Sequence, residues 1–314
     1  MKNFYIIGNG FDLHHDINCS YSNFRAWLDK HDRSFLLKMD EIYGCCDGDW
    51  WCDFENNLGE IDVMEYAQRV AFENGVDLSS DHCDSMWSDA QIEVENEMGG
   101  LYNALQGYFE EWVAQLNAPN PQKRVYMETQ DAAFLNFNYT QTLEDLYHLK
   151  PENVLHIHGA AGKGEKLIIG HRLSKDDLKH LYPTPNDLYR QGKIDEETAS
   201  SYDVHDEWAW EEAFSQVASM QKPVKKLILD YRQFFNNIKG AQKICAYGIS
   251  FSEVDLPYLN EIMLMAPLAK WEISYYSDRD KENVTAFAEN NGLQNYKLVR
   301  LSALKDPRQM SIDF

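Results

Sequence analysis

The 314-residue sequence predicts a protein of the α/β class, with an open, mainly parallel sheet that large helical insertions interrupt. Short runs rich in β-forming residues, each bounded by turn residues, recur along the chain. Several of them, such as Phe4–Ile7 and Lys243–Tyr247, are apolar on both faces. Strands buried on both sides usually belong to parallel sheets that helices cover. The segments between the runs repeat apolar residues at intervals of three and four, which indicates those helices.

Seven runs are predicted as strands: Asn3–Ile7, Ala133–Asn138, Val154–His158, Leu167–Ile169, Ile244–Tyr247, Trp271–Tyr276 and Leu298–Leu301. Helical spacing is clearest from Met98 to Leu116 and from Val224 to Ile238, after which Gly240 fits a C-cap. A third helix, Asp280–Asn291, lies between two strands and predicts a strand–helix–strand crossover.

The predicted strands cluster at the start, the middle and the end of the chain. We therefore expect one composite domain over residues 1–314. Its α/β core should comprise about 1–19, 130–173 and 240–314, and its helical insertions about 20–129 and 174–239.

The composition is strongly acidic, with 29 Lys and Arg against 51 Asp and Glu and a formal net charge of −22. Because phosphate contacts need clustered cations, this charge argues against a broad nucleic-acid-binding face, while a local basic pocket stays open. Between Asp40 and Gly100, seventeen residues are acidic and one, Arg69, is basic. This stretch is either a solvated acidic helical surface or a docking face for a basic partner protein.

The chain has no apolar run near the ~18 residues of a membrane span, and its first residues lack an apolar segment of signal-peptide length. We therefore expect a cytoplasmic protein with no membrane contact. Its cysteines form no C-x-x-C pair, so they should be free, mostly structural thiols in a reducing compartment. The six cysteines are Cys19, Cys45, Cys46, Cys52, Cys83 and Cys245.

Small, polar and protonatable residues follow four of the predicted strands. In open α/β sheets, ligands bind outside the carboxyl ends of the strands. We therefore expect these residues to line one cleft. The four segments are Gly8-Asn9-Gly10-Phe11-Asp12, Asn138-Tyr139-Thr140, His158-Gly159 and Gly248-Ile249-Ser250.

The turn after the first predicted strand contains two glycines, Gly8 and Gly10. Glycine permits a positive φ and close approach of the backbone to a ligand, and successive amide N–H groups on such a turn suit phosphate oxygens. The third glycine of G-x-G-x-x-G is absent, because Leu13 stands there. The turn is therefore either a phosphate cradle or a structural tight turn. Asp12 would repel a phosphate, so we expect it to bind a ribose hydroxyl or backbone amides, or to cap a helix.

Two predicted strands carry polar residues at alternate positions. Asn136 and Asn138 share one face of their strand, and His156 and His158 share one face of the next. A buried amide without partners costs about 1 to 3 kcal/mol, so Asn138 is either a hydrogen-bonded core residue or part of a site. His158 suits an acid/base role, because the pKa of histidine lies near neutrality.

A metal site is the alternative use of these histidines. The H-x-H pair at His156 and His158 would need a further ligand, and no acidic residue stands at a suitable spacing. We therefore expect no metal. The histidines available to complete such a site are His14, His15 and His171.

Six ordered motifs resemble those of the AbiH family of bacterial phage abortive-infection proteins. They are G-N-G-F-D after the first strand, W-x-D-F-E at Trp51–Glu55, F-N-Y-T-x-T-L-E at Phe137–Glu144, H-I-H-G at His156–Gly159, I-I-G-H at Ile168–His171 and Y-G-I-S-F-S-E-V-D at Tyr247–Asp255. They span nearly the whole chain, and their order makes the resemblance specific.

The AbiH family in turn is similar to proteins with the sirtuin-like fold, a Rossmann-like fold whose members bind NAD. By this resemblance, Asn138 would stand beside the nicotinamide ribose and His158 would be the catalytic histidine. Gly8 and Gly10 would cradle the pyrophosphate, and Gly248 and Ser250 would belong to the cofactor loop. We also expect Asn9, Asp12 and Asp255 to bind the cofactor.

The chain departs from the sirtuin pattern at three positions. Asn9 stands where Ala is usual, Asp12 where Ser is usual, and Thr140 where the N-x-D motif has Asp. These differences fall on the side chains expected nearest to the nucleotide.

The missing C-x-x-C pairs restrict the chemistry that the resemblance implies. Sirtuin deacetylases use a four-cysteine zinc module to shape the acyl-lysine groove, and this chain cannot build one. Attack of water on C1′ of the nicotinamide ribose remains, so the resemblance implies hydrolysis of NAD to nicotinamide and ADP-ribose in antiphage defence. His158 would act as the acid or base, and Asn138 would hold the water or the ribose hydroxyls.

Two other functions stay open on the sequence. The same pocket fits a nucleotide-binding sensor without turnover, with Thr140 marking lost catalysis, while His156, His158 and His171 fit a metal-dependent hydrolase or nuclease. Glu55 either reaches the pocket or caps a helix contact, and with Thr140 and His171 it is a further candidate site residue. The true nucleotide, the phage or host trigger and assembly as a homo-oligomer are likewise left open.

Overall fold

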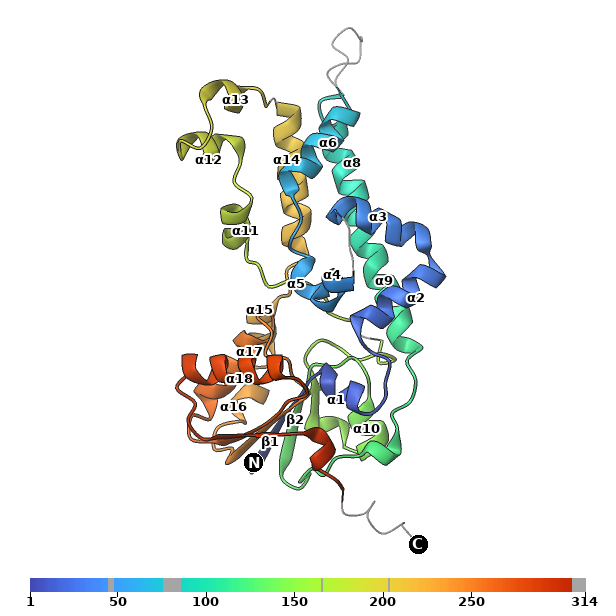
Figure 1. Cartoon of the computed structure of the whole chain (residues 1–314), viewed down its shortest axis with the longest axis vertical. Helices are drawn as coiled ribbons and strands as arrows, with labels where there is room; N and C mark the ends of the chain where they lie inside the picture. The colour runs from blue at the N-terminus through green and yellow to red at the C-terminus, as the bar shows by residue number, and fades with distance from the viewer. Residues whose placement is uncertain (45–47, 76–85, 165, 203, 307–314) are drawn as a thin grey trace. The chain divides into compact units, whose positions relative to one another are not determined.

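The computed structural model describes residues 1–44, 48–75, 86–164, 166–202 and 204–306. The chain forms two compact units (Figure 1). The α/β unit contains Met1–Phe24, Phe109–Ile168 and Pro223–Phe314, and the helical unit contains Arg25–Tyr108 and Ile169–Lys222. The α/β unit thus includes residues 109–129 and 223–239, which the sequence analysis placed in the insertions.

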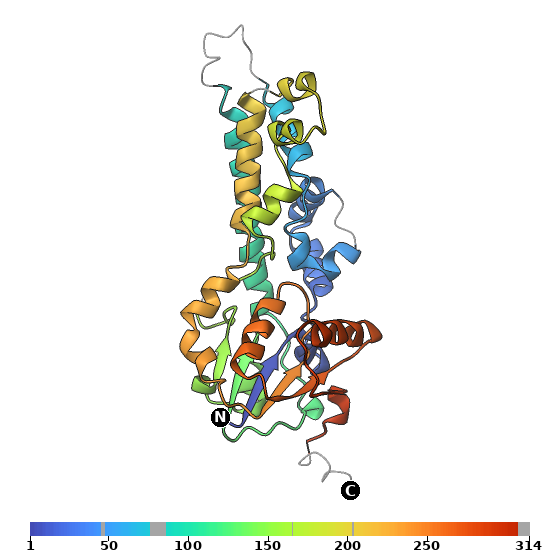
Figure 2. The ribbon, with the colours of Figure 1, turned by 90° about the vertical axis from the view of Figure 1, so that its left-hand side faces the viewer.

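The α/β unit is built on one six-stranded sheet in which every neighbouring pair of strands is parallel. Figure 2 shows its strand arrows pointing the same way. The spatial order β3-β2-β1-β4-β5-β6 reverses between β1 and β4, which is the doubly wound arrangement of dinucleotide-binding folds. The predicted Rossmann-like fold class is confirmed. The strands are β1 (Asn3–Ile7), β2 (Ala132–Asn136), β3 (Val154–His156), β4 (Lys243–Tyr247), β5 (Lys270–Ser274) and β6 (Tyr296–Val299).

One of the predicted strands is wrong, because Leu167–Ile169 is irregular chain. The backbone N–H of Ile168 donates to the carbonyl of His158 at 2.9 Å, so this segment returns beside the turn after β3 and adds no strand. Its two outer residues are buried, which explains their apolar character without a strand. β2 and β3 also end two residues earlier than predicted.

Helices cover both faces of the sheet (Figure 1). Tyr5 and Phe134 belong to the core on the face that α1 and α10 cover, while Phe4 and Ile244 belong to the core on the other face. Successive β1 residues therefore point to opposite sides, as a strand that is apolar on both faces predicts. The helices of this unit are α1 (Asn9–His14), α10 (Thr142–Tyr147), α15 (Val224–Asp230), α16 (Arg232–Asn236), α17 (Leu256–Met265) and α18 (Asp278–Asn290), with 3-10 turns η2 (Pro121–Lys123), η3 (Pro151–Asn153) and η4 (Leu301–Ala303).

α18 forms the predicted crossover between β5 and β6. Its first turn is a capping box, in which Ser277 Oγ accepts from the Asp280 N–H at 3.1 Å and Asp280 Oδ2 accepts from the Ser277 N–H at 2.8 Å. The helix ends just before Gly292, whose φ of +65° suits glycine. The segment predicted as one helix from Val224 to Ile238 is instead two, α15 and α16.

The helical unit carries most of the acidic charge. It contains 30 of the 51 acidic residues but only 11 of the 29 basic ones. Long α14 packs against α6 and α8, and none of the described helices is long and apolar enough to cross a membrane. The helices in or entering this unit are α2 (Tyr21–His31), α3 (Arg33–Tyr43), α4 (Gly48–Cys52), α5 (Phe54–Asn57), α6 (Val63–Glu73), α8 (Asp89–Val94), the π-helix η1 (Glu95–Gly99), α9 (Gly100–Ala114), α11 (Lys175–Leu181), α12 (Pro185–Arg190), α13 (Glu196–Ser200) and α14 (Val204–Ser219).

The turn after β1 packs directly on the backbone that follows β4. The N–H of Gly10 donates to the carbonyl of Gly248 at 2.8 Å, and a Cβ at Gly8 would lie 2.7 Å from that carbonyl oxygen. Gly248 has a φ of +69°, and a Cβ there would lie 1.9 Å from the Phe11 nitrogen. Gly8 has a φ of −120°, so the expected positive φ occurs at Gly248 and not at Gly8. The glycines are needed for close approach of two backbones at the switch point.

Gly248→Ala should therefore destabilise the protein more than a glycine substitution that changes φ alone. Gly240 is the matched control, because its φ is +87° and no atom lies within 4 Å of a Cβ placed there. Gly240→Ala should cost about 1 to 2 kcal/mol for the left-handed conformation. Gly248→Ala should cost about 3 kcal/mol or more, because the backbone of α1 must also move. Urea unfolding measures both, and equal losses would contradict the packing argument.

Candidate functional site

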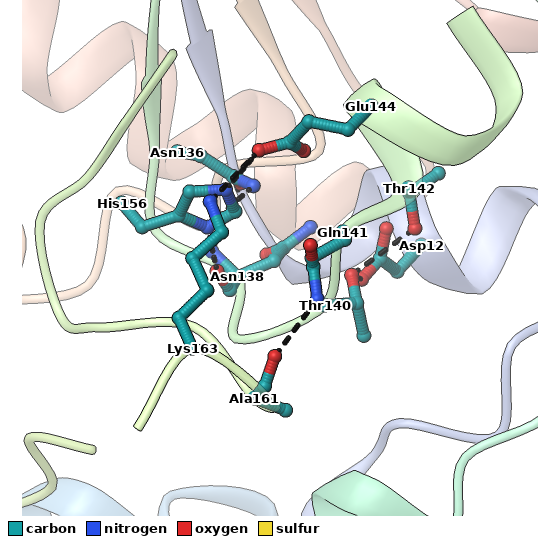
Figure 3. A network of polar contacts seen from close by, with 10 residues as sticks. All are labelled: Asp12, Asn136, Asn138, Thr140, Gln141, Thr142, Glu144, His156, Ala161 and Lys163. Atoms are coloured by element: carbon teal, nitrogen blue, oxygen red, sulfur yellow. Dashed lines mark hydrogen bonds and ion pairs between the residues drawn. The ribbon is translucent and has the colours of Figure 1, made fainter. Parts of the chain in front are cut away.

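A network of buried polar side chains lies at the carboxyl ends of β1, β2 and β3 (Figure 3). Asn138 is held by two bonds, since its backbone N–H donates to Asn136 Oδ1 at 3.1 Å and its Nδ2 donates to the carbonyl of Gly8 at 3.1 Å. Nδ1 of His156 lies 3.3 Å from both Asn136 Nδ2 and the carbonyl oxygen of Asn138. Asn138, which follows β2, is thus bound to the ends of both neighbouring strands, β1 and β3.

Glu144, in the first turn of α10, binds the other side of His156. His156 Nε2 lies 2.8 Å from Glu144 Oε1, and we assign the proton to Nε2 because a carboxylate only accepts. Lys163 Nζ donates to the same oxygen at 3.1 Å. Burial would raise the pKa of Glu144, but the hydrogen bond from His156 and the one from Lys163 lower it to about 2. Glu144 is therefore a fixed negative charge that orients the imidazole.

Asp12 is buried between the ends of β1 and β2, with 1% of its surface exposed. It lies within α1, whose N-cap is Gly8, so the capping role is wrong. Oδ2 accepts from Thr140 Oγ1, while Oδ1 has no hydrogen-bond partner among the described residues. Burial raises the pKa of the Asp12 carboxyl to about 6, although the polar side chains of Thr140, Thr142 and Asn138 beside it oppose the rise.

His158 contacts the core on the other face of the sheet. β3 ends at His156, and the N–H of Gly159 donates to the His156 carbonyl in a turn, so the alternation of a strand stops there. The prediction that His156 and His158 share one face is therefore wrong. The His158 ring packs edge-on against Phe137 and Tyr258, and its Nε2 lies 3.3 Å from Tyr258 Oη. His158 also packs against Tyr139, the residue between Asn138 and Thr140, with ring centroids 6.3 Å apart. That the four segments line one cleft stays a prediction.

The remaining predicted nucleotide-binding residues lie around the ends of β1 and β4. Asn9 is exposed and exchanges bonds with Cys19, donating from Nδ2 to its carbonyl at 3.2 Å and accepting from its Sγ at 2.8 Å. Ser250 is exposed, and its carbonyl accepts from Asn283 Nδ2 at 3.1 Å. Asp255 precedes α17 and accepts from Ser252 Oγ at 3.2 Å.

Two further candidates belong to the helical unit. Both oxygens of Glu55 accept from the buried Lys222 ammonium, at 2.8 and 3.0 Å. His171 is fully buried; its Nε2 lies 2.8 Å from the Val217 carbonyl and its Nδ1 accepts from the Leu173 N–H at 3.1 Å. Burial lowers the pKa of His171. The ion pair of Glu55 and the hydrogen bonds of His171 therefore join separate segments of the helical unit.

The structure does not assemble the alternative metal site. His156 binds Glu144, and His171 binds backbone in the helical unit. Over the ranges that the structure describes, no three His, Cys, Asp or Glu side chains are grouped to hold a metal ion. Cys19, Cys52 and Cys245 are free thiols. Cys45, Cys46 and Cys83 lie outside the described residues.

Sequence reasoning missed several members of the network, among them the charged residues Glu144 and Lys163. Glu144 is the last residue of the motif that begins at Phe137. Its place in that motif was the only feature that distinguished it from the other acidic residues of the chain. Lys163 follows a Gly-Ala-Ala-Gly loop, in which nothing in the spacing pointed to an ion pair with α10.

Asp12→Asn should change how stability depends on pH. The native carboxyl binds its proton more tightly than the unfolded chain, whose ordinary value is 3.8, so wild type loses stability as pH rises from about 4 to about 6. The variant lacks this loss. Between pH 4 and pH 7, the free energy of unfolding of wild type should therefore fall by about 3 kcal/mol relative to that of the variant.

Urea unfolding at several pH values measures this difference. Asp145→Asn, which removes an exposed carboxyl on α10, is the matched control. A difference that stays constant between pH 4 and pH 7 for Asp12→Asn would contradict the burial of a charged Asp12.

Comparison with known proteins places the chain in a family. The family model described as bacteriophage abortive infection AbiH matches residues 4–275. No curated protein and no solved structure matches the chain. The match covers most of the 314 residues and includes every residue of the polar network. The chain therefore belongs to the AbiH family of bacteriophage abortive infection proteins.

Proposed function

We propose that this AbiH protein defends the cell by hydrolysing NAD, or a closely related nucleotide, to nicotinamide and ADP-ribose. The observation that carries the proposal is the buried polar network around Asn138, at the carboxyl ends of a sheet whose strand order is that of dinucleotide-binding folds. Abortive infection follows from the family, while the nucleotide and the reaction rest on the resemblance to sirtuin-like proteins.

The side chains at this edge fit the sugar of a nucleotide. Oδ1 of Asp12 and Oε2 of Glu144 are buried carboxylate oxygens with no hydrogen-bond partner among the described residues, and ribose hydroxyls are donors that would satisfy such oxygens. Two negative charges also suit a reaction in which departure of neutral nicotinamide leaves positive charge on the ribose.

The turn after β1 fits a pyrophosphate less well. The N–H groups of Gly8, Gly10 and Phe11 already donate to the carbonyls of Tyr247, Gly248 and Gly8. A phosphate cradle at this turn would have to replace these bonds. Lys163, whose partly exposed ammonium binds Glu144 in the same network, is a cation that a phosphate could contact.

A sensor that binds a nucleotide without turnover is the second candidate. The observation that favours it is burial, since Asp12, Asn138 and His158 are only 1%, 6% and 2% exposed. Substrate would reach these groups only after the edge of the sheet opens. A trigger produced during infection would supply that opening in either case.

Asn138→Ala and His158→Ala should abolish phage protection and the loss of cellular NAD together. Removal of an acid or base typically lowers a rate about 10²- to 10⁴-fold, and loss of the Asn138 amide removes the group that positions ribose or water. The measurements are cellular NAD during infection and nicotinamide release by the purified protein with an extract of infected cells. Asn103→Ala and His180→Ala, both at exposed helix positions, are the matched controls.

His156→Ala tests which of the two histidines, His156 or His158, is the acid or base. Activity that survives loss of His158 but not loss of His156 would move the acid/base role to the histidine that Glu144 orients. Undiminished NAD in cells that are visibly protected would contradict NAD hydrolysis, and nucleotide bound to that protein would then favour the sensor.

A further inference from the structure

Two of the three positions at which the chain departs from the sirtuin pattern are bonded to each other. Asp12 stands where Ser is usual and Thr140 where Asp is usual, and the Thr140 hydroxyl donates to Asp12 Oδ2. The sirtuin pattern has a hydroxyl after the first strand and a carboxyl after the second. This chain has the carboxyl after β1 and the hydroxyl after β2. Figure 3 shows the two side chains pointing toward one another, with Thr142 beside them.

The burial of the pair gives its two members different roles. Asp12 is 1% exposed, whereas Thr140 is only partly buried and is the member that meets solvent. Because an ionised carboxylate only accepts, the Thr140 proton is committed to Asp12. Thr142 Oγ1 lies 3.1 Å from Thr140 Oγ1 and occupies a second position around that oxygen. The Thr140 oxygen keeps one lone pair to accept from a water or a ligand hydroxyl.

We infer that Thr140 and Asp12 form a relay that takes the proton of the attacking water, with Thr140 touching the water and Asp12 receiving the proton through it. The inference rests on the proposed NAD hydrolysis. The water oxygen bonds C1′ while the bond from C1′ to the nicotinamide nitrogen breaks, and that electron pair leaves with neutral nicotinamide. The water proton passes to Thr140 Oγ1 as the Thr140 proton passes to Asp12 Oδ2, and Asp12 later releases it to solvent.

Thr140 is therefore the catalytic residue of the pair, and Asp12 is a positioning residue that acts through it. The pKa of Asp12, raised by burial to about 6, suits a group that is ionised at neutral pH yet can hold a proton briefly. The titratable groups that face Asp12 are His156 from β3, Tyr147 from α10 and Cys19 from the segment after α1.

The competing explanation is that the bond simply ties the ends of β1 and β2 together. Thr140→Val and Thr140→Ser distinguish the two, because both keep a small side chain but only Ser keeps the hydroxyl. The relay predicts that Thr140→Val lowers kcat for nicotinamide release about 10²- to 10⁴-fold with little change in KM, and that Thr140→Ser retains most of the activity. Equal activity in the two variants would overturn the relay.

The pH profile tests the carboxyl itself. In wild type, kcat/KM should fall as pH drops below about 6, because protonated Asp12 cannot accept a proton. Asp12→Ser should lose most of the activity, and its remaining kcat/KM should no longer fall below about pH 6; this fall is the acidic limb of the profile. The exchanged double variant, Asp12→Ser with Thr140→Asp, should recover at least tenfold over either single variant, because it restores one carboxyl and one hydroxyl.

Purified full-length protein, NAD and an extract of phage-infected cells make up the assay, and thermal unfolding confirms that each variant is folded. A folded exchanged variant that recovers nothing, or an acidic limb that persists in Asp12→Ser, would overturn the relay while NAD hydrolysis stands. A wild-type protein that releases no nicotinamide in the extract would overturn both.

Discussion

The close approach of Gly248 to the backbone of Phe11 is the constraint on which the site depends. It fixes the end of β4 against the first turn of α1 at the switch point of the sheet, and it uses the Gly10 N–H that a phosphate would otherwise bind. The helix therefore starts at a set position, and Asp12 on its buried side must meet the end of β2. The glycine turn acts as a scaffold for a carboxylate, whatever else it binds.

The two carboxylates of the network are compensated very differently. Glu144 has an imidazole and an ammonium on one oxygen, and its pKa falls to about 2. Asp12 accepts a hydrogen bond from the Thr140 hydroxyl and has no ammonium bound to it, and burial raises its pKa to about 6. Neighbouring carboxyl groups whose environments separate their pKa values are a usual basis for distinct charge and proton-transfer roles. Burial of an undercompensated Asp12 destabilises the native state at neutral pH, which is typical of a residue kept for chemistry.

The sheet could be predicted because its signal is local, whereas the site needed contacts that no local pattern encodes. Runs such as Phe4–Ile7 are apolar on both faces, and that alone indicates a covered parallel strand. The same reasoning extended β3 to His158, because period-two spacing carries no information about where a strand yields to a turn. Asp12 and Thr140 each read as a departure from the resemblance, and only the fold shows that they are partners.

The distribution of charge between the two units bears on the ligand. Outside the helical unit, the α/β unit holds 21 acidic and 18 basic residues, so it is close to neutral although the chain has a net charge of −22. At physiological ionic strength, charges farther apart than about 8 Å are largely screened, so the groups of the polar network act strongly on a ligand that binds there. Those groups are two buried carboxylates, Lys163 and the His156 imidazole. Such an edge attracts a polar sugar and a cationic transition state more than it attracts a polyanion, which agrees with the proposed small nucleotide better than with a nucleic acid.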